Sequence, residues 1–182
     1  MTSDTRALRT ALTASVVLAT GAAGCGGDAV GDDPGAAAQA RVTRVVDGDT
    51  VHVRTRSGDD ETVRLALADA PESSTTRYGR TECGGTEAAT FLRRLVDGRD
   101  VTLRRPGGED HDRFGRSVAE LALDGRSVDE QLVVAGWAKP FRVPAADGGA
   151  AANRRIRRVA DRARDDDAGV WRLCGGFGRG GR

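Results

Sequence analysis

Alternation of apolar and polar residues predicts a β-hairpin near the start of the folded part of the chain. Valines flank the pair Asp47-Gly48 on both sides: Val42, Val45, Val46, Val51 and Val53. An Asp-Gly pair between two such runs is typical of a tight hairpin turn. The segment Glu61–Ala68 alternates in the same way. We therefore expect three consecutive strands.

Farther along the chain, apolar residues recur at helical spacing. Gly85–Val96 shows this spacing and is followed by Asp97-Gly98, a pair that ends helices. Ser127 opens a short helix that runs through Ala135, with Gly136 on its far side. Ala150–Ala168 is a third helix, rich in arginine, whose Ile156, Val159 and Ala163 are expected to face the core.

Two more strands, Val101–Leu103 and Ser117–Leu123, separate the first helix from the second. Five short strands interrupted by one helix are consistent with a small closed barrel of the OB-fold type. The pattern therefore predicts an α+β protein with a five-stranded barrel and three helices.

The ends of the chain have the composition of export and linker segments. Residues 1–24 combine a basic start, a short apolar stretch and small residues before Cys25, which favours a lipoprotein signal peptide. Cys25 then carries the lipid that anchors the protein to the outward face of the cell membrane; cleavage and free secretion is the alternative. We expect residues 25–40 to form a flexible tether and 175–182 a disordered Gly/Arg tail, which leaves 41–174 as the folded domain.

The formal net charge of +1 over 182 residues excludes a protein that holds nucleic acid through net charge alone. The charge is unevenly placed, because residues 25–138 are acidic overall and residues 139–182 are basic. This division suits a protein that binds a cation in one place and an anion in another. The alternative for Arg154–Arg164 is a solvated helix face, the commoner fate of a charge run.

Once Cys25 is assigned to the signal, Cys83 and Cys174 remain. Two cysteines in an oxidising compartment favour a disulfide, and two free buried thiols are the alternative. A metal site made by two cysteines without a nearby histidine is a much poorer match.

Three carboxylates stand where they can carry chemistry. Asp49 follows the hairpin turn, Asp69 ends the third strand, and Glu72 comes just after the rigid Pro71. If the second and third strands pair, Asp49 and Asp69 meet at one rim of the sheet. They repel each other there unless a hard cation such as calcium or magnesium lies between them. Glu72 is placed to accept a proton from water, whereas the alternative for this region is a simple turn and a strand end.

Two arginines strengthen this interpretation. Arg116 lies in a tight loop that opens the fifth strand, and Arg64 lies five residues before Asp69. In a regular strand Arg64 points away from Asp69, so it reaches the site only if the strand bends or twists. Guanidinium groups beside a metal-bound phosphate stabilise charge on its oxygens; surface ion pairs are the alternative. We interpret His52 and His111 as solvated residues without a role.

Three segments in this order resemble the active-site segments of the staphylococcal nuclease (thermonuclease) family: Val46–Val51, Val63–Glu72 and Asp112–Arg116. The likeness continues through Gly85–Ala89 and Gly136–Lys139 to Trp171. The resemblance implies an OB-type five-stranded barrel with three helices, in agreement with the pattern of the sequence.

The resemblance also implies calcium-dependent hydrolysis of phosphodiester bonds in DNA and RNA with low sequence specificity. On the family pattern, Asp49, Asp69 and the backbone carbonyl of Ala70 ligate Ca²⁺. Glu72 is the usual candidate for the general base. Ala70 replaces the more usual threonine, which matters little if only its carbonyl binds the metal.

Substrate contacts follow from the same resemblance. Arg64 and Arg116 bind the phosphate and stabilise the five-coordinate transition state. Arg113-Phe114 stands where the family has a lysine and a tyrosine, so a cation is kept and a hydroxyl is lost. Phe141 takes the place of the tyrosines that stack a base.

Exported relatives in this family often pair a cysteine before the first helix with one after the last Gly-x-Trp, here Cys83 with Cys174. No protein partner is implied, and we expect a monomer. The rival hypothesis is a non-catalytic OB-fold module that binds nucleic acid or protein. The retained carboxylates and arginines argue against it.

Overall fold

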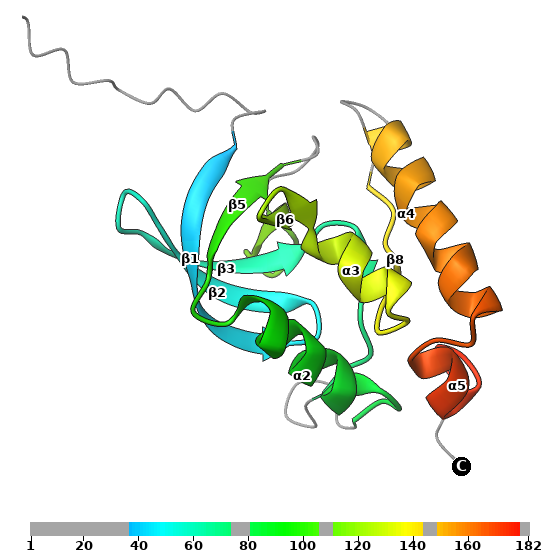
Figure 1. Cartoon of the computed structure of the whole chain (residues 1–182). Helices are drawn as coiled ribbons and strands as arrows, with labels where there is room; N and C mark the ends of the chain where they lie inside the picture. Colours follow the sequence, from blue (N-terminus) through cyan, green and yellow to red (C-terminus); the bar gives the residue numbers. More distant parts are fainter. Residues whose placement is uncertain (1–36, 74–80, 106–110, 144–148, 179–182) are drawn as a thin grey trace, which may run out of the picture. The chain divides into compact units, whose positions relative to one another are not determined.

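The computed structural model describes residues 37–73, 81–105, 111–143 and 149–178 (Figure 1). The predicted signal peptide, Cys25 and most of the predicted tether lie outside these residues. Within the described part of the chain, no helix has both the length and the apolar character needed to span a membrane.

Five strands form the predicted barrel: β1 (Ala38–Asp47), β2 (Thr50–Thr55), β3 (Asp60–Leu65), β5 (Asp100–Arg104) and β6 (Ser117–Leu123). They are antiparallel neighbours in the order β3-β2-β1-β5-β6, and a parallel pairing of β3 with β6 closes the barrel. Gly48 and Asp49 form the turn between β1 and β2. The predicted OB-type α+β fold is therefore confirmed.

Three two-residue strands complete the sheets. β4 (Ala68–Asp69) pairs with β8 (Lys139–Pro140) in a separate two-stranded sheet, and β7 (Arg126–Ser127) pairs with the end of β6. The sequence pattern did not predict them, because alternation is not detectable over two residues.

The three predicted helices are present as α2 (Gly85–Val96), α3 (Val128–Val134) and α4 (Gly149–Asp165). α2 has the predicted bounds. Ser127 is the N-cap of α3, since its hydroxyl accepts a hydrogen bond from the backbone N–H of Glu130 at 3.3 Å. A further short helix, α5 (Val170–Cys174), was not predicted.

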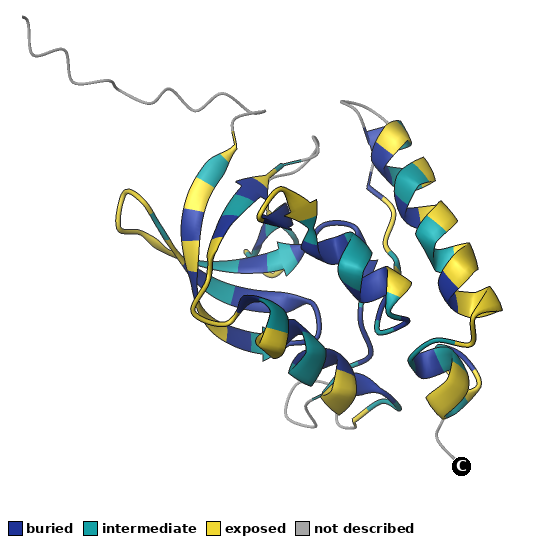
Figure 2. Ribbon diagram, in the orientation of Figure 1, coloured by how far each residue is buried: buried dark blue, intermediate teal, exposed yellow. Residues whose placement is uncertain are grey.

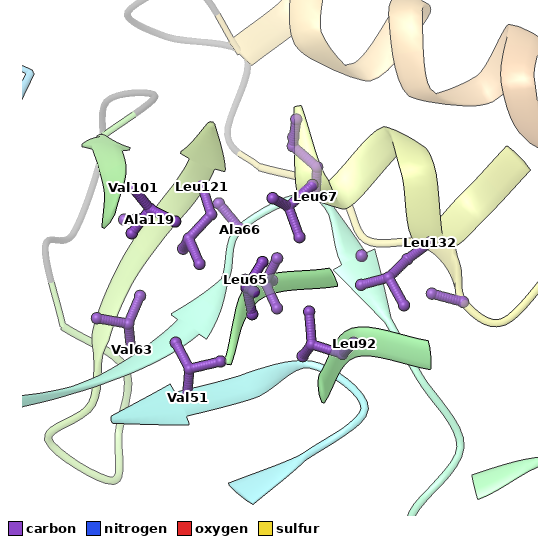
Figure 3. Close-up of a cluster of buried hydrophobic side chains, with 14 of the residues drawn as sticks. Val51, Val63, Leu65, Ala66, Leu67, Leu92, Val101, Ala119, Leu121 and Leu132 are labelled. Atoms are coloured by element: carbon purple, nitrogen blue, oxygen red, sulfur yellow. The ribbon is translucent and has the colours of Figure 1, made fainter. Parts of the chain in front are cut away.

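Apolar side chains fill the barrel and the contacts with the helices (Figure 3). Buried and exposed residues alternate along β1, and α4 turns one side toward the protein and the other toward solvent (Figure 2). The predicted core residues Ile156 and Ala163 of α4 are buried, and Val159 is half-buried. Each fully buried Leu or Ile contributes about 1.5–3 kcal/mol relative to an exposed one.

A disulfide joins Cys83, just before α2, to Cys174, the last residue of α5, with 6.1 Å between their Cα atoms. The pairing that the family resemblance implied is confirmed. The bond fastens the C-terminal helix to the segment that leads into α2.

Both predicted ends of the folded domain lie too far inward. Ala38–Ala40 already belong to β1, because they pair with β5. At the other end, the backbone N–H groups of Gly175 and Gly176 donate to carbonyls of α5, and the ring of Phe177 lies edge-on to Trp171 with centroids 5.4 Å apart. Glycine here ends a helix rather than starting a loose tail.

Candidate active site

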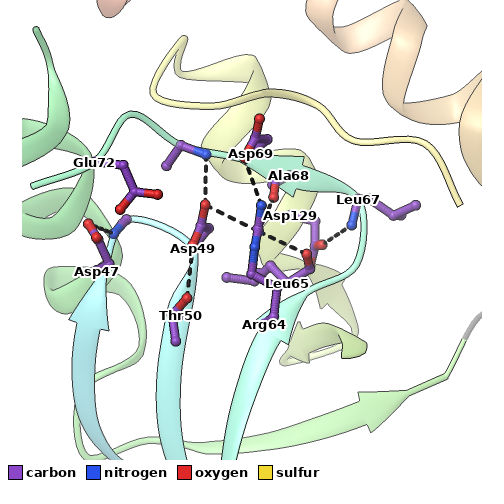
Figure 4. A network of polar contacts seen from close by, with 12 residues as sticks. Asp47, Asp49, Thr50, Arg64, Leu65, Leu67, Ala68, Asp69, Glu72 and Asp129 are labelled. Carbon is purple, nitrogen blue, oxygen red and sulfur yellow. Dashed lines mark hydrogen bonds and ion pairs between the residues drawn. The ribbon is translucent and has the colours of Figure 1, made fainter. Parts of the chain in front are cut away.

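The predicted catalytic residues and the predicted ligands Asp49 and Asp69 line one cavity of about 500 Å³, whereas Ala70 is not among its lining residues. It lies where the β1–β2 turn, the segment from β3 to Glu72 and the loop before β6 come together. Figure 4 shows the residues of the first two segments. The cavity is lined by Asp47, Asp49, Thr50, Arg64, Leu65, Asp69, Glu72, Asp112, Arg113, Phe114, Arg116, Val118 and Phe141. Predicted residues from distant parts of the sequence therefore meet in a single place.

Asp49 is a buried carboxylate held by several donors. One oxygen accepts from the backbone N–H of Ala70 at 3.0 Å, and the other accepts from the Thr50 hydroxyl at 2.9 Å. The Arg64 guanidinium lies 3.2 Å away. Burial nevertheless raises the pKa of Asp49, because Arg64 and the two hydrogen bonds offset only part of the lost hydration.

Gly48 allows the hairpin turn to reach this position. A Cβ atom at Gly48 would lie 2.7 Å from the Cβ of Ala70 and 2.9 Å from that of Ala88. The turn is thus wedged between the strand that carries Asp69 and helix α2. A larger residue at position 48 would push Asp49 away from Ala70.

Arg64 reaches both aspartates because the chain breaks between β3 and β4. Its guanidinium donates to Asp69 at 2.8 Å and to the carbonyl of Ala68 at 2.5 Å, besides the ion pair with Asp49 (Figure 4). A regular strand would have turned Arg64 away from Asp69. The bend at Ala66 and Leu67, which the sequence left open, brings the two together.

Asp129 of α3 fixes that bend. Its fully buried carboxylate accepts from the backbone N–H of Leu67 at 2.8 Å and from that of Leu121 at 3.2 Å. Burial raises the pKa of Asp129 to about 7, and the charge of Glu120 acts in the same direction. Asp129 was not predicted, because an acidic residue in the first turn of a helix is ordinary.

Asp69 has a second cationic neighbour that was not among the predicted site residues. Lys139 of β8 pairs in register with Asp69 of β4, and its ammonium nitrogen lies 3.1 Å from the Asp69 carboxylate. The only lysine of the chain therefore lies at the edge of the cavity. The motif Gly136–Lys139 contained it, but its pairing with β4 has no local signal.

Glu72 is half-buried and faces other carboxylates. Burial raises its pKa to about 8, and Asp47, Asp49 and Glu82 add to the effect. Asp47 is itself buried in the turn, where its carboxylate accepts from the backbone N–H groups of Gly48 and Ser73. Negative charge is thus concentrated around Glu72.

The backbone of Glu72 is held from the side of α2. Glu82 donates its N–H to the Glu72 carbonyl at 2.8 Å, and its carboxylate accepts from the Glu72 N–H at 3.3 Å. A Cβ atom at Gly85 would lie 2.3 Å from the Glu72 carbonyl oxygen, so this position requires glycine. Glu82 was not predicted, and it lies next to the disulfide at Cys83.

Asp112 orients Arg116 within its loop. Its carboxylate accepts from the backbone N–H groups of Phe114 and Arg116 and from the Arg116 guanidinium at 2.6 Å. Burial acts to raise the pKa of Asp112, but these hydrogen bonds together lower it. Arg116 also donates to Thr50 at 3.3 Å, so the loop is linked to the β1–β2 turn.

Two exposed aromatic rings lie beside the arginines of the cavity. The Arg113 and Arg116 guanidinium carbons lie 4.7 and 5.4 Å from the centroid of the Phe114 ring. Arg64 lies 5.4 Å from the centroid of Phe141. Arg113 is exposed and lines the cavity, as expected for a residue that contacts substrate.

The donor set at this site fits a hard cation. The carboxylates of Asp49 and Asp69 offer oxygen ligands of the kind that calcium prefers, and Arg64 lies between them as a positive charge. In the described residues, no three His, Cys, Asp or Glu side chains are arranged as a ready-made metal site. The fit therefore rests on donor chemistry and on the excess of negative charge around Glu72.

A comparison with protein families finds a match over residues 62–173 to the family described as staphylococcal nuclease homologue. The matched segment includes Arg64, Asp69, Glu72 and Arg116. It also includes the three helices that the sequence predicted.

Three of the curated relatives come from Bacillus. An uncharacterised protein of Bacillus anthracis is 35% identical over 97 residues, which make up 53% of this chain and 44% of the relative. The SPbeta prophage-derived endonuclease YokF of Bacillus subtilis is 35% identical over 96 residues, 53% of this chain and 32% of the relative. Endonuclease YncB of the same organism is 33% identical over 96 residues, 53% of this chain and 44% of the relative. The chain thus matches less than half the length of each.

Proposed function

The chain belongs to the staphylococcal nuclease homologue family, and from this premise we propose that it is a calcium-dependent nuclease that hydrolyses DNA and RNA with low sequence specificity. One observation carries the proposal: Asp49, Asp69, Glu72, Arg64 and Arg116 line the same cavity. Two of the relatives are named endonucleases, which supports the reaction class.

In this proposal, Asp49, Asp69 and the carbonyl of Ala70 hold the calcium ion. Bound calcium supplies Lewis-acid chemistry at a phosphate oxygen. Arg64 forms ion pairs with both aspartates, so its guanidinium becomes available to a substrate phosphate when another cation neutralises these carboxylates.

Arg64 and Arg116 are the phosphate-binding residues of the mechanism. Both side chains are largely enclosed, with 12% of their surface exposed, so their hydrogen bonds to a phosphate face little competition from water. Asp112 and Thr50 hold Arg116 in place before substrate arrives. Donors fixed in this way stabilise the negative charge that builds up when a fifth oxygen approaches phosphorus.

Glu72 is the proposed acceptor of a proton from the attacking water. A pKa of about 8 leaves this carboxyl largely protonated at neutral pH while the neighbouring carboxylates are uncompensated. Positive charge among them lowers the pKa of Glu72 and prepares it to accept a proton. Glu82 and Gly85 keep the backbone of Glu72 in position for this step.

Phe114 and Phe141 are proposed to contact the bases on either side of the cleaved bond. Both rings are exposed, and both lie beside arginines of the cavity. Stacking on an aromatic ring is possible for every base, which suits an enzyme of low sequence specificity. Arg113 adds a cation at the same edge.

We also propose that the protein is exported and anchored through a lipid on Cys25, and that it acts as a monomer. The disulfide between Cys83 and Cys174 supports an oxidising compartment. Labelling with radioactive palmitate in the producing bacterium tests the anchor. Label that disappears in a Cys25→Ser variant supports it, and an unlabelled wild-type protein contradicts it.

Degradation of single-stranded DNA by the oxidised protein tests the activity. We expect cleavage with calcium and none with excess EGTA. Arg116→Gln is expected to lose the activity, whereas Arg158→Gln, which removes an exposed guanidinium on α4, keeps it. Intact DNA under both conditions, from a folded sample, would contradict the proposal and favour a binding module.

A further inference from the structure

The outer face of strands β1, β2 and β3 continues away from the proposed active site in rows of paired residues. The first row lies at the cavity, where Thr50 of β2 pairs with Arg64 of β3. In the second row, His52 pairs with Arg44 on one side and with Thr62 on the other. The second row is therefore the immediate neighbour of the phosphate-binding residues.

A chain of hydrogen bonds joins the three residues of the second row. Arg44 lies 2.9 Å from Nε2 of His52, and Thr62 Oγ1 lies 3.0 Å from Nδ1. A guanidinium can only donate, so Nε2 accepts and the ring proton is on Nδ1, which donates to Thr62. The hydroxyl hydrogen of Thr62 is then available to another acceptor. The exposed Arg44 and the half-buried Thr62 thus have hydrogen-bond donors to offer to a ligand.

Arg44 differs from the arginines of the row beyond it. Arg41 pairs with Asp100 at 3.1 Å, and Arg54 makes a two-pronged pair with Asp60 at 2.8 Å. Within the described residues, no carboxylate forms an ion pair with the exposed Arg44. A guanidinium that is fixed by a neutral histidine, and that forms no ion pair with a carboxylate of the described residues, is suited to an anion from outside.

We propose that Arg44 and Thr62, positioned by His52, bind a backbone phosphate of a single nucleic-acid strand whose next phosphate lies at Arg64 and Arg116. The inference rests on the proposed nuclease function and extends its substrate-binding surface. Rows two residues apart along a strand are about 7 Å apart. This spacing is close to the through-space separation of successive phosphates along one nucleic-acid strand, so each row can hold one phosphate.

Binding of a fluorescein-labelled thymidine octanucleotide, measured by anisotropy in EDTA over a series of salt concentrations, tests the proposal. We expect Arg44→Gln to weaken binding roughly 10-fold at low salt and to reduce the slope of log affinity against log salt by about 0.7. The matched control Arg93→Gln removes an exposed arginine on α2 and leaves affinity and slope unchanged. Equal binding by the two variants would overturn the proposal.

The salt dependence of binding also tests whether His52 positions Arg44. His52→Leu keeps the charge of Arg44 but removes its acceptor, so we expect weaker binding with an unchanged salt slope. A slope reduced as much as in Arg44→Gln would contradict this role.

Measuring binding in EDTA makes it possible to test the phosphate-binding surface independently of nuclease activity. Binding in EDTA needs no cleavage, so a protein that never cuts DNA but shows the expected loss in Arg44→Gln supports the surface and contradicts the nuclease. A protein that cuts DNA with calcium while Arg44→Gln and Arg93→Gln bind alike supports the nuclease and contradicts the surface.

Discussion

Two clusters in this protein are built from the same chemical groups but differ in charge balance. Each has one arginine between two carboxylates: Arg64 with Asp49 and Asp69 in the cavity, and Arg155 with Glu120 and Glu130 beneath α4. In the cavity, further carboxylates crowd around the cluster, whereas the second cluster joins α4 to β6 and α3.

The pKa shifts in the two clusters favour opposite charge states, although all of them are upward. Burial raises the pKa of Asp49 and, together with neighbouring carboxylates, that of Glu72. Beneath α4, burial acts to lower the pKa of Arg155, but Glu120 and Glu130 outweigh it and raise the pKa. The fold therefore disfavours the charged state of the cavity carboxylates and favours that of Arg155.

This difference separates a site prepared for a ligand from a structural contact. The cavity has more negative charge than its own cations neutralise, so positive charge brought from outside is stabilised there. The ion pairs of Arg155 with Glu120 and Glu130 instead join α4 to β6 and α3. Counting arginines and carboxylates would not distinguish the two, but the charge state that the raised pKa values favour does.

The largest expected effect is on catalysis. Glu72→Gln should lower kcat on single-stranded DNA roughly 10³-fold, because the proposed proton acceptor is lost. The thermal midpoint should not fall, since a carboxyl that resists ionisation is removed. Steady-state kinetics and calorimetry on the same sample check both results. Glu87→Gln, on the exposed side of α2, is the control, and unchanged activity in Glu72→Gln would remove Glu72 from the mechanism.

Asp129 has a raised pKa like Glu72 but lies in a structural position, so its substitution tests whether a raised pKa alone identifies a catalytic group. Its pKa of about 7 lies above the ordinary value of 3.8, so the unfolded chain releases the proton first as the pH rises. The stability that Asp129 contributes is complete below pH 3.8 and is lost as the pH rises toward 7. Between pH 5 and 8, we expect the wild-type protein to lose about 3 kcal/mol more than Asp129→Asn does.

Urea unfolding at a series of pH values measures this difference in stability. The kcat of Asp129→Asn at pH 8 should remain within about 10-fold of the wild-type value, since Asp129 only fixes the bend that places Arg64. Parallel pH profiles of the two proteins would contradict the shift. A loss of activity as large as in Glu72→Gln would make Asp129 part of the chemistry.

Removing Arg155 should cost stability rather than activity. Arg155→Met leaves Glu120 and Glu130 without a cation, and we expect the free energy of unfolding to fall by about 2 kcal/mol, because the arginine is partly exposed. Cleavage of a dinucleotide should be unchanged. Arg158→Met, which removes an exposed arginine from the same helix, is the control. A stability loss no larger than in this control would show that the cluster does not hold α4.

Calcium should stabilise the folded protein only by binding in the cavity. With free ion at roughly ten times its Kd, we expect the folded state to gain about 1.4 kcal/mol. Asp49→Asn should abolish this gain, and Glu120→Gln should keep it even though its starting stability is lower. Differential scanning fluorimetry with and without calcium measures both. An equal gain in both variants would place the ion outside the proposed site.

Local signals in the sequence accounted for the hairpin and α2, since an Asp-Gly turn and an apolar stripe are properties of neighbouring residues. The reach of Arg64 could not be predicted, because the bend after β3 depends on Asp129, which is distant in sequence. Glu82 and Lys139 were missed for the same reason, as each meets the site through pairing that leaves no local pattern. The family resemblance named residues of the cavity but not the groups that hold them.

The parallel pairing of β3 with β6 has a consequence for the kinetics of folding. Arg64 pairs in register with Val118, and Arg116 directly precedes the first paired residue, Ser117. Strands so far apart in the sequence meet late, because closing a long loop costs entropy before any contact repays it. The two arginines are therefore brought together only by the step that closes the barrel. Recovery of activity during refolding should follow that step and lag behind the formation of the β1–β2 hairpin.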